Sequence, residues 1–448
     1  MVVGRAAGAV VVAGAGVIRQ PRLLLVAPFG SYRTAPFLTA ACARADVVLV
    51  SEGTANVVSS GLPGLRLPLH DLDACERAVR AEIDRGGAFQ AILGLDDWGA
   101  EVAGALAPRL GLAANPPQAL ATARRKDWAR AALQAAGVLV PWHQVLTLDG
   151  GLPPLSDLPY PLVLKPVASS GSRGVMRVDD EAGLRAGIAR LRGILGRDER
   201  VVWNRALIER FVPGFEIALE GLLTGGVLQT LAIFDKPEPL DGPFFEETYY
   251  ISPSRLDAAT REAVRDCVER GARAYGLREG PIHAECRVNA AGIWVIEIAA
   301  RTIGGLCARL LRFGTGLSLE DLVVRHALGE ELAVGAREGA AGVLMIPIPG
   351  LGILKRVEGL MAADRVPGVV EVVIDAREGQ ELVPLPEGAS YLGFIFAEGP
   401  DPQMVYEALK TAHGHLRFVL APVWRPAVMP AGEAATDAAT TAKAMPQA

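Results

Sequence analysis

A short stretch near residue 290 constrains the fold and the chemistry of this chain more than any other. Two apolar-rich runs, residues 283–288 and 293–301, flank an Asn-Ala-Ala-Gly connection, and this pattern predicts two adjacent strands joined by a tight turn. Each run contains a glutamate among apolar residues, Glu285 in the first and Glu297 in the second. Either these carboxylates lie on the solvent side of the hairpin, as strand alternation allows, or they are buried and share a cation. Mg²⁺, which prefers oxygen ligands, would fit the second alternative.

The first part of the chain alternates between strand and helix patterns. Short apolar runs that end in turn residues predict buried strands, and longer periodic runs predict helices. The predicted strands are residues 22–28, 46–51 and 91–95, and the predicted helices are residues 34–44, 71–86 and 98–110. Such alternation is typical of a doubly wound α/β domain.

The patterns beyond Asn115-Pro116-Pro117 are of α+β character. The predicted helices there are residues 117–136, 181–195, 257–275, 318–327 and 402–416, and the predicted strands outside the hairpin are 141–147, 160–166, 175–178, 206–212, 215–224, 226–235, 342–348, 369–374 and 391–397. We therefore expect an α/β and α+β multidomain protein. Its expected segments are a flexible leader (1–20), an N-terminal α/β domain (21–115), a central α+β domain (116–335), a small α+β C-terminal domain (336–424) and a disordered tail (425–448) rich in Ala, Thr and Pro.

Composition excludes several classes of function. The net charge is −5, and no cluster of Lys and Arg forms the basic face expected of a nucleic-acid-binding protein. The five cysteines are scattered without a CxxC pair, which argues against a disulfide framework or a thiolate zinc site and suits the cytoplasm. The apolar run within residues 1–20 is too short to span a bilayer; a signal peptide there is the alternative to a flexible leader. We expect a cytoplasmic protein without membrane or nucleic-acid partners.

A Ser/Gly-rich loop follows a predicted strand that ends at Lys165. Residues 169–174 read Ser-Ser-Gly-Ser-Arg-Gly, and small residues of this kind let backbone N–H groups approach phosphate oxygens. The ammonium group of Lys165 would point at the same phosphates. A plain hairpin turn explains the loop equally well by itself, and the GxxxxGK[ST] pattern of a P-loop is absent. Lysine is scarce beside arginine in this chain, so each lysine near such a loop is informative.

A strand followed by a Pro-Gly break carries two further glutamates, Glu209 and Glu216. Such a connector offers carboxylates and backbone N–H groups to a nucleotide base and its ribose. Taken separately, both side chains could also be exposed charges at strand ends. Arg301, four residues after Glu297, would suit a phosphate or carboxylate in bidentate fashion.

Taken in order, these motifs resemble the ATP-grasp superfamily of ligases over about residues 20–420, with a two-lobed ATP-grasp core at 116–335. The resemblance implies that ATP binds between two α+β lobes, with Lys126 and Lys165 on its phosphates, Glu209 on the adenine amino group, Val212 at the hinge backbone and Glu216 on the ribose. It implies Mg²⁺, in one or two copies and replaceable by Mn²⁺, at Glu285 and Glu297, and Arg301 as the catalytic residue beside the acyl phosphate. The full set expected to bind ATP or substrate is Lys126, Lys165, Ser169, Ser170, Gly171, Ser172, Gly174, Glu209, Phe211, Val212, Glu216 and Glu247.

The C-terminal part resembles that of the L-amino acid ligases, which form dipeptides. Residues 342–352 and 391–395, together with a substrate-like region that begins at Glu247, carry this likeness. The resemblance places Glu247 near the substrate amine. Two positions depart from it: Ala299 stands where many members have a metal-binding Asn, and Tyr250 stands where some have His.

The resemblance implies a carboxylate–amine ligase that works through an acyl phosphate and joins amino acids, or an amino acid and a related acid or amine. The alternatives are a different ATP-grasp chemistry, such as that of a biotin carboxylase or a purine-pathway ligase, and an ATP-binding protein without turnover. The expected partners are small carboxylate and amine substrates, and a homodimer is possible for such ligases.

Overall fold

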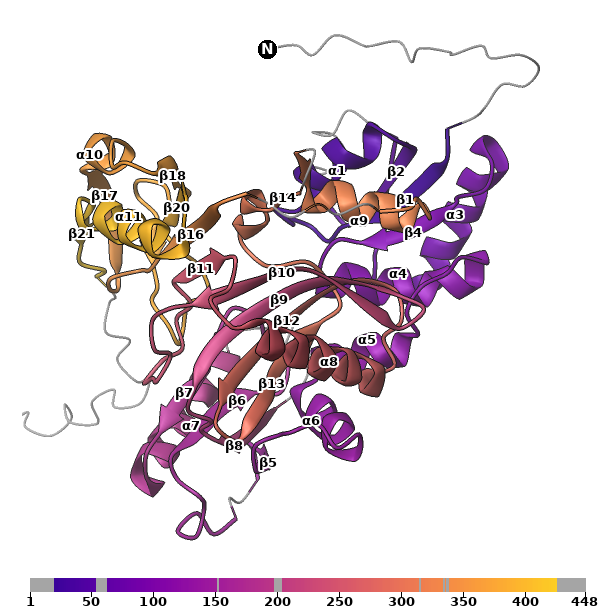
Figure 1. The fold of residues 1–448 in the computed structure, drawn as a ribbon. Helices are drawn as coiled ribbons and strands as arrows, with labels where there is room; N and C mark the ends of the chain where they lie inside the picture. The colour runs from indigo at the N-terminus through magenta and orange to yellow at the C-terminus, as the bar shows by residue number, and fades with distance from the viewer. Residues whose placement is uncertain are drawn as a thin grey trace, which may run out of the picture.

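The computed structural model of this chain describes residues 20–53, 63–150, 153–196, 204–313, 316–332, 335 and 338–424. The predicted leader, apart from Gln20, and the whole predicted tail lie outside the described residues. Figure 1 shows the chain running from an N-terminal α/β unit into two further sheets and then into a C-terminal unit. The predicted combination of α/β and α+β architecture is confirmed.

The N-terminal unit is built on a parallel sheet with the strand order β3-β2-β1-β4. Its strands are β1 (Arg22–Val26), β2 (Asp46–Ser51), β3 (Gly64–Arg66) and β4 (Ala91–Gly94). Every side chain of β1 is buried, as the continuous apolar run predicts for a strand covered on both faces. The sequence patterns did not reveal β3, which has no buried residue.

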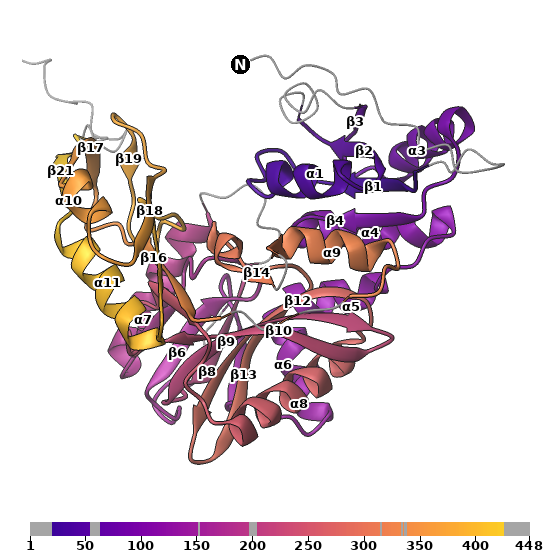
Figure 2. The same cartoon turned by 45° about the horizontal axis from the view of Figure 1, so that its top comes forward.

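Helices cover both faces of this sheet. One face packs against α3 (Leu72–Gly86) and α4 (Asp97–Leu110). The other packs against α1 (Thr34–Cys42) and α9 (Leu319–Ala327). Helix α9 returns to the N-terminal unit from a distant part of the sequence, as its orange colour among indigo elements shows in Figure 2.

The predicted helix 117–136 is two helices, α5 (Pro117–Arg124) and α6 (Lys126–Ala135). Arg125 between them is extended, with φ −98° and ψ 103°. The N–H of Lys126 donates to the carbonyl of Val167 at 2.9 Å instead of to the preceding helical turn. The break therefore arises from a tertiary contact, and it fixes Lys126 at the first position of α6.

A four-stranded antiparallel sheet forms one wall of the central region, in the order β5-β8-β6-β7. Its strands are β5 (His143–Thr147), β6 (Leu162–Pro166), β7 (Met176–Val178) and β8 (Arg205–Arg210). Helix α7 (Glu181–Leu195) buries its apolar side against these strands. Asp180 caps this helix by accepting from the Gly183 N–H at 2.7 Å, which agrees with the predicted start.

An eight-stranded antiparallel sheet forms the other wall, in the order β13-β12-β9-β10-β11-β16-β20-β18. Its strands are β9 (Phe215–Thr224), β10 (Val227–Lys236), β11 (Tyr249–Ser252), β12 (Gly280–Asn289), β13 (Gly292–Ala299), β16 (Ala340–Ile346), β18 (Val369–Ile374) and β20 (Gly393–Gly399). Helix α8 (Ala258–Tyr275) packs on this sheet together with α5 and α6.

The C-terminal unit continues this sheet. The unpredicted strand β11 joins β10 to β16, so β16, β20 and β18 extend the central sheet without a break. The remaining C-terminal elements are a three-stranded sheet of β17 (Gly352–Glu358), β19 (Glu381–Leu382) and β21 (Arg417–Ala421), and helices α10 (Leu360–Asp364) and α11 (Pro402–Gly414). The connection from β13 to β16 also contains the 3-10 helix η1 (Cys307–Leu310) and the short pair β14 (Arg312–Phe313) and β15 (Leu317–Ser318). The segment boundaries expected at residues 115, 335 and 424 stay a prediction.

None of the helices in the described ranges is both long enough and apolar enough to cross a membrane.

Candidate active site

The glutamate-bearing hairpin lies at one edge of the eight-stranded sheet, as β12 and β13. Glu285 and Glu297 are cross-strand partners in this ladder, so their side chains emerge on the same face of the sheet. The Glu285 side chain is 18% exposed and the Glu297 side chain 32%. Neither carboxylate is fully exposed, and each has a cation beside it, Lys236 near Glu285 and Lys126 near Glu297.

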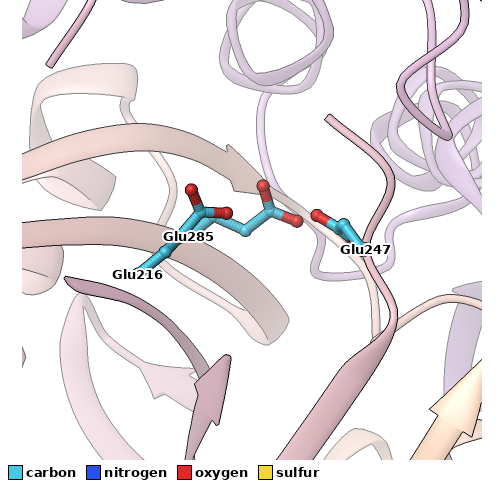
Figure 3. Close-up of side chains that lie close together, drawn as sticks. All are labelled: Glu216, Glu247 and Glu285. Carbon is cyan, nitrogen blue, oxygen red and sulfur yellow. The ribbon is translucent and has the colours of Figure 1, made fainter. Parts of the chain in front are cut away.

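Lys236, at the end of β10, is the cation next to Glu285. Its Nζ lies 2.9 Å from Glu216 Oε1, 2.7 Å from Glu247 Oε1 and 3.6 Å from Glu285 Oε1. The three carboxylates converge from β9, β12 and the segment before β11, as Figure 3 shows. One oxygen of each lies within 4.8 Å of the others. This is the donor set that a hard divalent cation prefers.

Mutual charges shift the pKa values in this cluster. Burial alone would raise the pKa of Glu285, but the ammonium of Lys236 and then the imidazole of His283 lower it to about 2. Burial, and then the neighbouring Glu285, raise the pKa of Glu247. The pKa of Lys236 is raised because its three carboxylate neighbours outweigh burial. Glu285 thus carries a negative charge beside the Lys236 ammonium group.

Glu216 is held on both sides by its neighbours in the sheet. The β9–β10 register places Lys236 directly opposite Glu216, and the β9–β12 register places Arg287 opposite it on the other side. The Arg287 Nε donates to Glu216 Oε2 at 2.7 Å, and Arg287 Nη1 donates to the carbonyl of Val212 at 2.6 Å. The Arg287 guanidinium also lies over the ring of Phe211, 5.0 Å from its centroid. The predicted hinge residues and the predicted ribose ligand thus share one arginine.

Glu209 and Lys165 form a second buried ion cluster on the four-stranded sheet. Lys165 Nζ contacts Glu209 Oε1, while Arg130 Nε donates to Glu209 Oε2 at 2.8 Å and Arg130 Nη2 donates to Glu209 Oε1 at 3.2 Å. Burial lowers the pKa of Lys165 to about 8, partly offset by the Glu209 charge. Burial would raise the pKa of Glu209, but Arg130 and Lys165 hold it well below its usual range. The assignments of Lys165 to phosphate and of Glu209 to adenine stay predictions.

Lys126 joins the Ser/Gly loop to the hairpin. Its Nζ donates to the Ser169 carbonyl at 2.8 Å and lies 3.3 Å from Glu297 Oε2. In the loop, Gly171, Ser172 and Gly174 all have positive φ, of 63°, 53° and 76°. The N–H of Gly174 donates to the Pro386 carbonyl at 2.9 Å, so the loop is anchored to the C-terminal unit.

Arg301 turns toward the N-terminal unit. Its Nε lies 3.1 Å from both carboxylate oxygens of Asp97, which opens α4. Its pKa is raised because the Asp97 and Glu297 charges outweigh burial. Arg301 therefore stands between the hairpin and the carboxyl edge of the parallel sheet.

His283 occupies the space beside Ala299. The two residues are cross-strand partners, so the missing Asn side chain leaves a methyl group next to an imidazole. His283 Nδ1 lies 2.5 Å from Glu220 Oε1, and His283 Nε2 lies 3.4 Å from Glu285 Oε1. Burial would lower the pKa of His283, but the hydrogen bonds with Glu220 and Glu285 raise it to about 9. An imidazolium thus neighbours the first predicted metal ligand.

Sequence reasoning missed the charged partners of the predicted site residues and of His283. They are Lys236, Arg287, Arg130, Glu220 and Asp97. Lys236 carried a usable signal, because the chain has only six lysines and this one ends an apolar strand pattern. Asp97 did as well, since it follows a buried parallel strand, where ligand-binding groups gather. No local pattern marks Arg130.

Residues 158–309 match the ATP-grasp domain family, and residues 344–421 match the L-amino acid ligase C-terminal domain 2 family. The chain thus contains an ATP-grasp domain and an L-amino acid ligase C-terminal domain. The predicted resemblance is thereby confirmed, and the two matches lie within the predicted segments 116–335 and 336–424.

Two of the similar proteins are ligases, and a third is uncharacterized. The fold is similar to a crystal structure of an L-amino acid ligase from Bacillus licheniformis, with a TM-score of 0.73 and 26% identity over 90% of this chain and 100% of that one. An alanine–anticapsin ligase of Bacillus subtilis is 30% identical over 216 residues, or 44% of this chain. An uncharacterized protein of Sinorhizobium fredii is 27% identical over 302 residues, or 66% of this chain. The chain spans 45% and 61% of the length of these two curated relatives.

Proposed function

We propose that this protein is an ATP- and Mg²⁺-dependent ligase that joins the carboxylate of one amino acid to the amine of another and releases ADP. One observation carries the proposal: three lysines, on helix α6 and strands β6 and β10, each pair with a carboxylate of the two sheets. Lys126, Lys165 and Lys236 lie beside Glu209, Glu247 and the hairpin glutamates. Phosphoryl transfer depends mainly on such positioning and charge compensation.

Glu285 and Glu297 fit a divalent ion. Their side chains are 18% and 32% exposed, against 8% for Glu216, and they are partners across the ladder. An ion could reach them without disrupting the more buried pair of Glu216 with Arg287. When bound, Mg²⁺ would neutralise charge on the ATP phosphates. The number of ions is left to measurement, because Ala299 supplies no ligand.

The chain's own side chains would perform the remaining steps. Lys126 and Lys165 would hold the phosphates, and Arg301 would stabilise negative charge as the substrate carboxylate attacks the γ-phosphate to give an acyl phosphate and ADP. Glu247 would accept hydrogen bonds from the incoming ammonium group. After the ammonium group loses one proton to solvent, the amine nitrogen forms the amide bond, the bond from the acyl carbon to the phosphate oxygen breaks, and the second proton leaves with the hydrogen phosphate. The Ser/Gly loop, anchored at Pro386, would exclude water from the acyl phosphate.

The proposal is tested by measuring ADP release with ATP and Mg²⁺ against amino acids supplied singly and in pairs. We expect release that depends on particular pairs, with a product whose mass is that of the dipeptide. Glu285→Gln and Glu297→Gln should each lower turnover by about 100-fold or more, because each removes a ligand charge with little change in volume. Glu262→Gln, at a carboxylate whose side chain is 62% exposed, is the matched control and should retain full activity.

Two outcomes would favour the alternatives. ADP release that requires bicarbonate and a biotinyl carrier would indicate a carboxylase. ATP binding without ADP release for any pair would indicate a binding protein and refute the ligase proposal.

A further inference from the structure

The crevice expected beyond the carboxyl ends of the parallel strands in the N-terminal unit adjoins Arg301, whose Nε contacts Asp97 at the start of α4. In the strand order β3-β2-β1-β4, the chain leaves β1 toward β2 on one side, while β4 lies on the other side of β1. The carboxyl ends of β1 and β4 therefore form a topological switch point, which is where ligands bind in open α/β sheets. The loop after β1 supplies Arg33 to this crevice, and the loop after β4 supplies Asp97.

The crevice is closed on its far side by the chain that follows the hairpin. Arg33 Nη2 donates to the carbonyls of Thr302 and Ile303, at 3.3 and 3.2 Å. The N–H of Gly305 donates to the Tyr32 hydroxyl at 2.8 Å. These contacts hold the crevice against the segment that carries Arg301.

Arg33 is a buried cation without a carboxylate partner. It is 9% exposed, and no Asp or Glu of the described ranges is recorded within 4 Å of it, since Asp97 pairs with Arg301. Its Nε is buried and has no hydrogen-bond partner. Burial, and then the nearby charge of Arg301, lower the pKa of Arg33. Burying a charged guanidinium that has no anionic partner is unfavourable, and a bound anion would relieve that cost.

The start of α1 adds to the positive character of this crevice. Arg33 is the N-cap residue of α1, which has no side-chain cap and no acidic residue in its first turn. Its amino-terminal dipole is therefore uncompensated by the chain itself and favours an anion.

We infer that Arg33 binds the free carboxylate of the amine-donating amino acid. This inference rests on the proposed ligase function. In that reaction the carboxylate of one substrate becomes the acyl phosphate beside Arg301, whereas the amine donor keeps its own carboxylate unreacted. A planar guanidinium recognises such a carboxylate in bidentate fashion. Each arginine then binds one anion: Arg301 stabilises the carboxylate that becomes the acyl phosphate, and Arg33 orients the free carboxylate of the amine donor.

The experiment compares each accepted amine donor with its primary amide, which has the same amine and side chain but no carboxylate. For Arg33→Met we expect kcat/KM for the acid to fall by about 10- to 100-fold, the usual range for losing a charge-assisted hydrogen-bonded pair. The value for the amide should stay within about threefold of the wild type, and so should KM for ATP and for the carboxylate substrate. Arg33→Lys, which keeps the charge but not the planar fork, should give an intermediate loss. Arg66→Met, at an exposed arginine of the same unit, is the control.

Several results would overturn the inference. Equal losses for acid and amide, with a lowered unfolding midpoint, would make Arg33 structural. A loss of ATP-dependent phosphate release in the absence of any amine would assign Arg33 to the acyl phosphate. If the wild type releases no ADP with any pair, the proposed function fails. In that case, calorimetric binding of the standard amino acids and their amides to wild type and Arg33→Met still decides whether Arg33 binds a carboxylate, and equal affinities would reject it.

Discussion

Replacing Lys236 with Met should destabilise the protein by leaving three carboxylates without their shared cation. Glu216, Glu247 and Glu285 each offer an oxygen within 4.8 Å of the others. At that separation, with an effective dielectric constant of about 20, each pair of negative charges repels by about 3.5 kcal/mol. Protonating one carboxyl relieves the repulsion and costs about 4 kcal/mol at pH 7.5 for a group with an ordinary pKa. We therefore expect the variant to lose about 3–5 kcal/mol, which is the usual cost of removing one member of a buried ion cluster.

The dependence of this loss of stability on pH and on Mg²⁺ identifies electrostatics as its cause. In the variant, the carboxyl pKa values of the folded state lie above those of the unfolded state, so stability is retained at low pH and lost as pH rises through the folded-state values. Lowering the pH from 7.5 to 5.5 should accordingly recover up to about 2.7 kcal/mol of the difference from wild type, for one proton taken up. Mg²⁺ at 100 times its dissociation constant from the variant should stabilise the variant by about 2.7 kcal/mol, and the same concentration should stabilise the wild type less, because Lys236 already compensates the carboxylates.

The assay is urea unfolding followed by tryptophan fluorescence at both pH values, with and without MgCl₂. Lys355→Met, at an exposed lysine of β17, is the matched control and should resemble the wild type. The reasoning is refuted if Lys236→Met stays within 1 kcal/mol of the wild type, or if its deficit is the same at both pH values.

Three further predictions concern other parts of the site and its support. Because burial lowers the pKa of Lys165 to about 8, ATP binding at pH 8 should take up about half a proton, which calorimetry in buffers of different ionisation enthalpy measures. Lys165→Arg should abolish this proton uptake, and uptake that persists in the variant would exclude Lys165 as its source. Arg130→Met should lower the free energy of unfolding by about 3–5 kcal/mol, because Glu209 stays buried without this partner. Adding Glu209→Gln should recover much of that loss, and strictly additive losses in a double-mutant cycle would contradict the pairing. Asn115→Ala removes three hydrogen bonds to residues 278–279 and should lower the free energy of unfolding by about 1–3 kcal/mol. Amide hydrogen exchange at residues 278–279 should become faster, and unchanged exchange would show that this turn does not depend on Asn115.

Elements whose ends are set by local chemistry could be predicted from the sequence. Helix α7 and strands β9 and β18 have the predicted bounds. Asp180 caps α7, and a Pro-Gly break immediately precedes each of the two strands. The division of the helix at Arg125 could not be foreseen, because no Gly or Pro marks it and the backbone of Lys126 is drawn to Val167.

The residues of the site also fall into those that the sequence alone reveals and those that depend on tertiary contacts. Carboxylates within apolar runs are visible in a sequence because burying a charge is unfavourable, and this identified Glu285 and Glu297. Their cations are invisible because sheet register decides which residues meet. Lys236 and Arg287 flank Glu216 only because β10 and β12 pair with the two edges of β9. The strand β11, with four residues between irregular segments, was likewise too short to recognise, although it joins the C-terminal strands to the central sheet.

The surroundings of Glu247 bear on how such a site would select its amine. Lys236 occupies one oxygen of Glu247, and the Tyr250 hydroxyl donates to the other at 2.5 Å. Burial, and then the nearby carboxylates, raise the pKa of Tyr250, so the phenol stays a neutral donor where an imidazole could carry a positive charge. A neutral donor leaves the negative charge of the pocket available to an ammonium group. Recognition of the amine would then depend on charge shared among Glu247, Glu285 and Lys236, and recognition of the amino acid as a whole would depend on the anion site that Arg33 provides on the opposite unit.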